Sequence, residues 1–243
     1  MQLNDSLEQF QEQGLAITGI SYDSVATVRH FSERVGIQYP LLADPDAANI
    51  QAFGVVNTRV SPERRNHGIP FPGIYIIDEN GIVREKYFEM NYRERFTARS
   101  ILARDFGVFV GPQTELETEG QHIPISIYTS DPVAQPGNRL SLVVEFDLPP
   151  KMHLYAPGVE GYTPLFLAIE PDYRFQIHDL QYPDPDILYL PAIKERVPVY
   201  HGKVRVIQEV TLTADYTDEW VKKGVITISS RLDPDDPGPY FIL

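Results

Sequence analysis

The sequence contains no cysteine among its 243 residues. This absence excludes disulfide bonds, thiolate metal sites and thiol catalysis within these residues. Long hydrophobic runs are missing as well, since no apolar stretch approaches the roughly 18 residues that a membrane span needs. We therefore expect a protein without a membrane span. The hydrophobic share of 42% and the charged share of 23% are typical of a soluble globular protein.

Positive charge is scarce, and the formal net charge is −13. Such a surface repels duplex nucleic acid and anionic membranes, which argues against both as partners. The charge is also uneven. Residues 1–112 hold 11 Lys/Arg against 14 Asp/Glu, whereas residues 113–243 hold 10 against 20. This difference predicts two bodies with different surfaces.

Helical and strand patterns alternate in residues 1–112, which is typical of an α/β domain with one parallel pair of strands and one hairpin. The hairpin signal is Asn80-Gly81, which supplies the positive φ angles of a tight turn. The expected elements are, in chain order, a helix carrying Leu3, Leu7 and Phe10, a strand over 15–20, a helix capped by Asp23 and ended by Gly36, a helix over 45–53 capped by Asp44, strands over 74–77 and 82–88, and a helix from Asn91 to about Asp105.

The pattern changes after Gly111-Pro112, because 16 of the 21 prolines lie beyond residue 111 and interrupt almost every potential helix. Residues 113–120 are rich in glutamate and predict a linker. Residues 121–243 then show a succession of short alternating strands, which favours a β-sandwich. The expected strands lie at 125–129, 140–146, 165–169, 204–212 and 225–229.

Three motifs in the first half resemble, in the same order, those of redoxins of the AhpC/TSA (peroxiredoxin) family. They are Gly19-Ile20-Ser21-Tyr22-Asp23-Ser24, Pro40-Leu41-Leu42-Ala43-Asp44-Pro45-Asp46 and Pro72-Gly73-Ile74-Tyr75-Ile76-Ile77-Asp78-Glu79-Asn80-Gly81. The resemblance covers about residues 2–105. It implies a thioredoxin fold whose reactive cysteine follows the first core strand. Since the chain opens on the next helix, we expect that strand and its cysteine to lie upstream of Met1.

The resemblance also has a structural consequence. In the thioredoxin arrangement the missing strand lies between the strands at 15–20 and 74–77. Both would then expose unpaired backbone groups and apolar side chains. We expect the chain to be less stable than an intact relative, or to pair these strands differently.

The second half resembles, through fewer residues, the N-terminal domain of DsbD thiol-disulfide interchange proteins, an immunoglobulin-like sandwich. The residues that carry this resemblance are Pro150-Lys151-Met152-His153-Leu154-Tyr155, Pro164-Leu165 and Val199-Tyr200-His201-Gly202-Lys203. That family ends with a pair of cysteines, whereas residues 232–240 hold none. The expected fold is thus an α/β thioredoxin-like domain, incomplete at its N-terminus, followed by an all-β immunoglobulin-like sandwich.

Three residues are expected beside a redoxin active site by resemblance: Tyr22, Pro72 and Gly73. Pro72 aligns with a proline that is cis in thioredoxin-like proteins; the alternatives are that Pro70 is the matching proline or that Pro72 is an ordinary trans loop proline. Tyr22 follows a strand end, where α/β folds assemble sites. No residue of this chain is predicted to be catalytic itself.

Several other polar residues allow either a functional or an ordinary structural interpretation. Arginines 93, 95, 99 and 104 with Lys86 form either an anion-binding face or a solvated helix surface. His153 and His201 either converge or are ordinary loop histidines. No close ligand spacing among the histidines and no phosphate-binding glycine motif is present, so we expect neither a metal site nor a cofactor. Asp233, Asp235 and Asp236 are either a weak calcium site or a charged tail.

The sequence supports two functional hypotheses. The first is a bacterial thiol-dependent antioxidant of the peroxiredoxin kind, inactive as written, which would take a peroxide or protein disulfide and a thiol reductant if an upstream cysteine exists. The second is a non-catalytic binding module that docks a protein through its β-sandwich. The N-terminus shows no secretory signal, which predicts a cytoplasmic protein; a true N-terminus further upstream would allow a periplasmic one.

Overall fold

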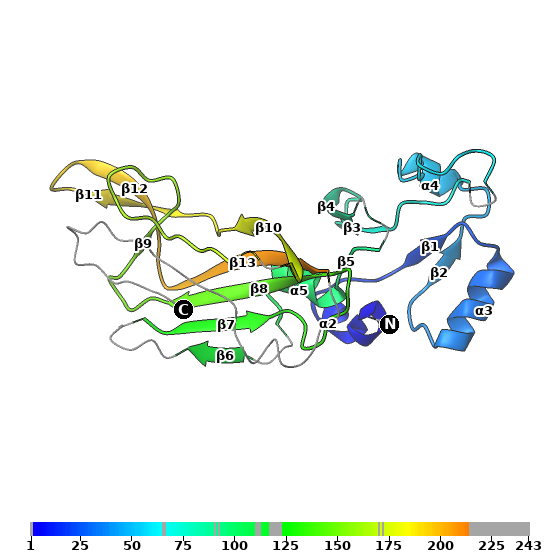
Figure 1. Ribbon diagram of the computed structural model, residues 1–243, viewed down its shortest axis with the longest axis horizontal. Coiled ribbons are helices and arrows are strands. Elements are labelled where there is room, and N and C mark those ends of the chain that lie inside the picture. Colours follow the sequence, from blue (N-terminus) through cyan, green and yellow to red (C-terminus); the bar gives the residue numbers. More distant parts are fainter. Residues whose placement is uncertain are drawn as a thin grey trace. The chain divides into compact units, whose positions relative to one another are not determined.

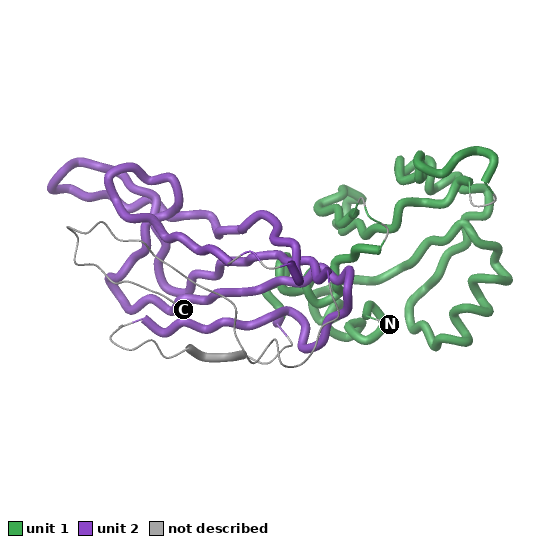
Figure 2. Tube along the Cα trace, in the orientation of Figure 1, with its two compact units in different colours: residues 1–108 green, residues 109–243 purple. Residues whose placement is uncertain are grey.

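The computed structural model describes residues 2–64, 67–89, 91, 93–109, 113–116, 123–169, 171 and 173–213 (Figure 1). The chain forms two compact units, Met1–Val108 and Phe109–Leu243, which Figure 2 draws in green and purple. None of the helices in the described part of the chain has the length and apolar character to cross a membrane.

The first unit mixes short helices with short strands (Figure 1). Its elements are α1 (Gln2–Asp5), α2 (Leu7–Glu12), β1 (Gly19–Ser21), α3 (Val25–Val35), β2 (Leu41–Ala43), α4 (Ala48–Ala52), β3 (Gly73–Ile77), β4 (Val83–Phe88), β5 (Arg95–Phe96) and α5 (Ala98–Phe106). The expected first helix is split into α1 and α2, and the expected strand over 15–20 is ordered as a strand only from Gly19.

Two separate strand pairs form the sheets of this unit. β1 pairs in parallel with β2, with Ile20 opposite Leu42. The predicted elements include no strand at residues 41–43, so β2 is an addition to them. β3 pairs in antiparallel fashion with β4, which confirms the predicted hairpin, but only Gly81 of the Asn80-Gly81 pair has a positive φ. Gly81 has φ of 79°, and the Asp78 carboxylate accepts hydrogen bonds from the N–H groups of Asn80 and Ile82, both at 2.9 Å.

Two helix caps differ from the predicted ones. Ser24, rather than Asp23, caps α3, because Ser24 has the extended backbone of a cap and its hydroxyl accepts from Thr27 N at 3.3 Å. Asp23 instead accepts from the Ser21 hydroxyl at 2.5 Å. Thr97, rather than Asn91, caps α5 by accepting from the N–H of Ser100 at 3.0 Å. The predicted end of α3 at Gly36 is confirmed, with φ of 72°.

Asp44 holds the start of α4, although the helix begins at Ala48 instead of residue 45. Its carboxylate accepts from the backbone N–H groups of Asn49 at 3.2 Å and Ile50 at 3.0 Å. The Ile50 hydrogen bond, with those of Asn49, lowers the pKa of Asp44, while burial acts in the opposite direction. The side chain therefore fixes the loop between β2 and α4.

The second unit is built from strands (Figure 1). Its elements are β6 (Gln113–Leu116), β7 (Ile125–Thr129), β8 (Asn138–Asp147), β9 (Leu154–Tyr155), β10 (Phe175–Gln181), β11 (Asp186–Leu190), β12 (Glu195–Tyr200) and β13 (Lys203–Leu212). One sheet contains β10-β13-β8-β7-β6 in that order, and a smaller one contains β11-β12-β9. All these pairings are antiparallel.

Of the expected strands of the second half, those at 125–129, 140–146 and 204–212 are present within β7, β8 and β13, and β9, β10, β11 and β12 are additions to the predicted strands. The other expectations differ from the structure or lie outside it. Residues 113–116, expected in a linker, form β6. Residues 165–169 form no strand, although Leu165, Leu167 and Ile169 are buried in the expected alternation. Alternating apolar residues indicate which side chains are buried, but their burial does not require that the backbone forms the hydrogen bonds of a strand. The expected strand at 225–229 lies outside the described residues.

Each unit has its own hydrophobic core. In the first unit, Phe10 of α2 and Tyr87 of β4 pack with Ile101 and Leu102 of α5. In the second unit, a larger cluster contains residues of both sheets. Its members include Ile125 of β7, Phe146 of β8, Val206 of β13 and Tyr200 of β12. The two cores follow the division of the chain into two units.

Candidate functional site

The first unit contains a cleft of about 620 Å³. Its walls come from the segment that ends in β1, from the whole of β3, and from side chains of α2 and α5, including Phe10 and Ile101. No residue of β2 and only Phe88 of β4 lines it. The cleft therefore lies along one edge of β1 and one edge of β3.

The cleft lining is apolar. None of the residues that line it, within the described part of the chain, carries a charge, and the polar ones are Thr18, Tyr39, Asn49 and Tyr75. Burial raises the pKa of Tyr39, so its phenol stays neutral. A cleft of this size and character suits an apolar ligand or an apolar stretch of polypeptide.

An aromatic cluster forms one part of the wall. The Tyr75 ring on β3 lies 5.4 Å from the Phe53 ring and 4.9 Å from the Phe88 ring. The Tyr75 hydroxyl donates to the carbonyl of Phe53 at 3.3 Å. Beside it, the N–H of Phe71 donates to Val55 O at 2.7 Å, which fixes the loop that leads into β3.

Two of the three expected site residues line the cleft, and the third does not. Pro72 and Gly73 belong to its wall at the start of β3, whereas Tyr22 lies outside it with 40% of its surface exposed. The expected cis form of Pro72 is wrong, because the described residues contain no cis peptide bond and the trans alternative holds. Tyr22 directly follows β1, and the last residue of β1 that lines the cleft is Ile20.

Gly73 is required by packing. A Cβ placed on Gly73 would lie 2.2 Å from ring carbons of Phe88, its partner across the β3–β4 pair. A Cβ on Gly19 of β1 would lie 2.6 Å from Cδ2 of Leu41. Glycine therefore lets the neighbouring side chains lie close to the backbone on both walls of the cleft. The sequence indicated these positions only through the family motifs.

The two histidines of the second unit come together. The rings of His153 and His201 are 5.9 Å apart, and His201 Nδ1 lies 3.5 Å from Asp186 Oδ2. Burial, together with the charge of His201, lowers the pKa of His153. Within the described residues, no group of three or more histidines and carboxylates is placed to hold a metal ion. The aspartates at 233–236 lie outside that part of the chain.

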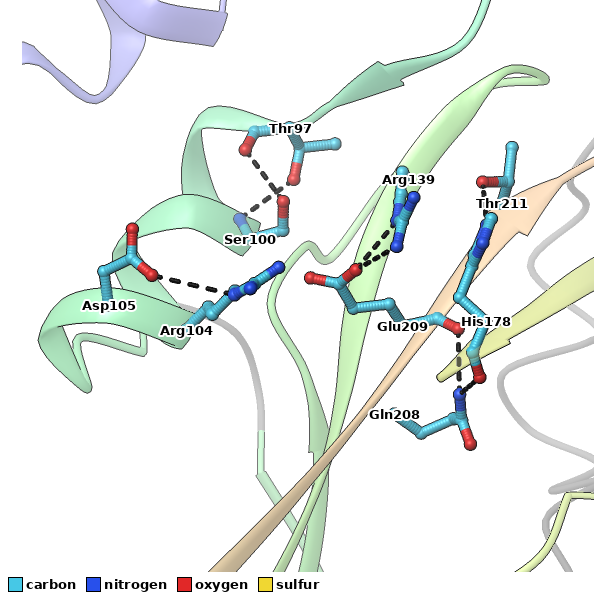
Figure 3. A network of polar contacts seen from close by, with 9 residues as sticks. All are labelled: Thr97, Ser100, Arg104, Asp105, Arg139, His178, Gln208, Glu209 and Thr211. Atoms are coloured by element: carbon cyan, nitrogen blue, oxygen red, sulfur yellow. Dashed lines mark hydrogen bonds and ion pairs between the residues drawn. The ribbon is translucent and has the colours of Figure 1, made fainter. Parts of the chain in front are cut away.

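A buried ion pair joins β8 and β13 of the second unit (Figure 3). Arg139 donates to Glu209 Oε2 from Nε at 2.8 Å and from Nη2 at 2.5 Å, and the Glu209 side chain is 1% exposed. His178 Nε2 lies 2.7 Å from Thr211 Oγ1. Sequence reasoning missed these residues, because only the strand register brings them together. Their contacts lie between strands and point to a structural role.

Among the arginines of this segment, Arg104 has the contacts that the plainer interpretation predicts. Arg104 lies 3.7 Å from Asp105 and 5.5 Å from the centre of the Tyr87 ring. The hydroxyl of Tyr87 in β4 donates to the carboxylate of Asp105 in α5, and burial together with that carboxylate raises the pKa of Tyr87. These contacts are those of a helix surface paired with nearby acidic and aromatic groups.

Comparison with known proteins relates most of the first unit to one family. Residues 1–86 match the model of the AhpC/TSA family. The chain is 31% identical over 81 residues to "Putative peroxiredoxin Rv2521" of Mycobacterium tuberculosis, a match that covers 32% of this chain and 48% of that protein. It is 27% identical over 96 residues to "Putative peroxiredoxin bcp" of Haemophilus influenzae, covering 38% of this chain and 59% of that protein. The chain thus spans about half the length of these curated relatives. The cleft lies within the AhpC/TSA-like segment except for Phe88 and Ile101.

Proposed function

We propose that the first unit is the redoxin part of a thiol-dependent peroxidase or disulfide oxidoreductase. The observation that carries this proposal is the AhpC/TSA match over residues 1–86. In such chemistry a thiolate attacks a peroxide oxygen, the O–O bond breaks, and the sulfur becomes a sulfenic acid while water or an alcohol leaves. Alternatively, the thiolate attacks a disulfide sulfur, the S–S bond breaks, and a mixed disulfide forms while the other sulfur leaves as a thiolate. A thiol reductant then restores the thiolate. The 243 residues contain no cysteine. Under this proposal the sulfur belongs to a cysteine outside them.

The residues of the first unit would form the surroundings of that sulfur. The cleft that Pro72 and Gly73 help to line is apolar and without charged residues in the described part. An apolar wall excludes water from a reacting sulfur and from the substrate. Tyr22 lies outside the lining and has no assigned part in the proposed site.

Peroxide consumption by the protein from its native host tests the proposal. Intact mass and a free-thiol count come first, followed by hydrogen peroxide and a model disulfide as substrates with dithiothreitol as reductant. We expect turnover that is abolished when thiols are blocked with N-ethylmaleimide. The recombinant 243-residue chain is the control, and we expect no turnover from it. A host protein that carries a thiol but consumes neither substrate overturns the proposal.

A second candidate function, favoured by the absence of cysteine, is a non-catalytic binding module. A host protein of 27.6 kDa without a thiol would favour it over the enzyme. In this case the apolar cleft and the second unit would serve only to bind partners.

We further propose that the second unit is an immunoglobulin-like sandwich similar to the N-terminal domain of DsbD proteins, and that it docks a protein partner. Its two antiparallel sheets and the core shared by residues of both support the sandwich. An experimental structure of the full chain tests this fold. A structure in which the β11-β12-β9 sheet does not pack face to face on the larger sheet would overturn it.

A further inference from the structure

We propose that His153 and His201 of the second unit form an acid-sensitive latch. While the two rings are uncharged, the short strand β9 stays paired with β12. When both rings carry a proton, below about pH 6, their repulsion releases β9 and the loop at residues 156–164. This inference does not depend on the proposed redox function. It rests on the placement of the two rings, on the charged groups around them and on the few contacts that hold β9.

The first argument is that the strand register places the two histidines opposite each other. Tyr200 of β12 pairs with Leu154 of β9, and His201 and His153 are the next residues beyond this pair. The centres of their rings are 5.9 Å apart. Like charges that lie directly opposite on neighbouring strands destabilise the pairing. Two protonated rings therefore act against the pairing of β9 with β12.

The second argument concerns the charged groups around the pair. Asp186 of β11 faces His201, with 3.5 Å between Oδ2 and Nδ1, so its carboxylate can form an ion pair with a proton on that ring. His153 is in the opposite situation, because burial and the charge of His201 lower its pKa. Lys151 and Lys203, each two residues along the chain from one of the histidines, are exposed and add positive charge. The proton on His153 is therefore the one that the closed latch resists.

The third argument is that few contacts hold β9 in place. The strand has two residues, which form two register pairs with β12. At its end, Ala156 N donates to Pro198 O at 3.0 Å, and Leu165 N donates to Tyr155 O at 2.8 Å. The ring of Tyr155 stacks on that of Tyr162, with centroids 4.4 Å apart. Segments held by so few contacts open locally without unfolding of the rest of the protein.

Opening of the latch would uncover one apolar face of β12. Side chains alternate along a strand, so Glu195, Val197 and Val199 share a face, and the two valines are 4% and 0% exposed. Tyr155 is the register partner of Val199, and the Tyr162 hydroxyl donates to Glu195 Oε2 at 2.8 Å. The stacked tyrosines thus reach both ends of this face. Release of β9 couples a fall in pH to exposure of apolar surface.

Hydrogen exchange of the full chain at two pH values tests the inference. Opening constants are compared at about pH 7.5 and about pH 5, after correction for the intrinsic pH dependence of amide exchange. The pKa of His153 is lowered in the closed form, so the open form binds the proton more tightly and gains population as the pH falls. We expect the opening constant of residues 153–165 to rise at least about threefold. We expect peptides from β7 and β8 to show no rise, and an equal rise there overturns the inference.

Histidine variants separate the latch from a general effect of acid. We expect His153→Gln to abolish the rise. We expect His201→Gln to reduce it by at least about half, since burial still opposes a charge on His153. The matched control is His30→Gln, an exposed histidine of α3, which should leave the rise unchanged. An unchanged rise in His153→Gln or in His201→Gln overturns the inference.

An NMR titration of the histidine rings supplies a readout that a merely structural contact would not move. We expect the pKa of His153 to increase in His201→Gln, because a positive neighbour is removed. An unchanged pKa shows that the two rings do not interact, and it overturns the latch even if both variants fold normally. None of these measurements involves a thiol, so failure of the peroxidase assay and failure of this test are distinguishable.

Discussion

Substituting Gly73 by alanine tests whether the start of β3 is fixed by packing against β4. The new Cβ would lie 2.2 Å from Cδ1 and Cε1 of Phe88. Ordinary carbon contacts are about 3.5–4.0 Å, so the Phe88 ring must move by more than about 1 Å. The ring also packs against Tyr75, with centroids 4.9 Å apart, and movement would weaken this contact. The clash therefore affects a wall of the cleft directly.

The expected cost follows from two opposing contributions. Overpacking of this kind costs about 1–3 kcal/mol. Gly73 is not among the residues with positive φ, so alanine adopts its backbone conformation and gains about 0.4–1 kcal/mol from the smaller entropy of the unfolded chain. We expect Gly73→Ala to lower the local free energy of unfolding by about 1–2 kcal/mol.

Hydrogen exchange measured on peptides from β3 and β4 gives this local free energy, and peptides from the second unit serve as an internal control. The decisive comparison is the same substitution in a Phe88→Ala background. Without the ring, we expect Gly73→Ala to be neutral or slightly stabilising. A cost that is unchanged in that background would refute packing against Phe88 as the reason for glycine at this position.

Two other contacts lead to predictions of different kinds. Arg139→Met removes the ion pair of the buried Glu209 carboxylate and should cost about 3–5 kcal/mol, measured by hydrogen exchange in β13. Lys203→Met removes a 63% exposed partner in the same strand pair and should cost at most about 1 kcal/mol, and equal costs would contradict the reasoning. The pKa of Asp44 is lowered in the folded chain, so its ionised form contributes stability that is complete above the unfolded value near 4 and is lost as the pH falls through the lower folded value. The difference in urea-unfolding free energy between the native chain and Asp44→Asn should therefore shrink as the pH falls from 7 toward 2; a constant difference would contradict this reasoning.

Local signals in the sequence were sufficient for the β3–β4 hairpin. Its alternating strands, the positive φ at Gly81 and the hydrogen bonds of Asp78 all act within a few residues. The start of α3 was misassigned because Asp23 and Ser24 are both good cap residues and adjacent. The choice between them depends on which backbone is extended and on the competing contact of Asp23 with Ser21. Residue type alone does not decide between such neighbours.

Features that depend on strand register could not be predicted. Arg139 and Glu209 are 70 positions apart, and they meet only because β8 pairs with β13 in one register. The reason for glycine at position 73 likewise requires Phe88 as its cross-strand neighbour. The family motifs indicated Pro72 and Gly73 as site neighbours, but they could not indicate this contact.

The persistence of the cleft follows from how its two walls are supported. A two-stranded sheet alone is marginal in water, and the first unit holds two of them. Ile74 and Ile76 of β3 pack against the core formed by α2 and α5, while the loop after β2 is fixed by Asp44. Phe10 and Ile101 of that core, and Ile50, whose N–H donates to Asp44, also line the cleft, so the contacts that support the walls are part of the lining itself.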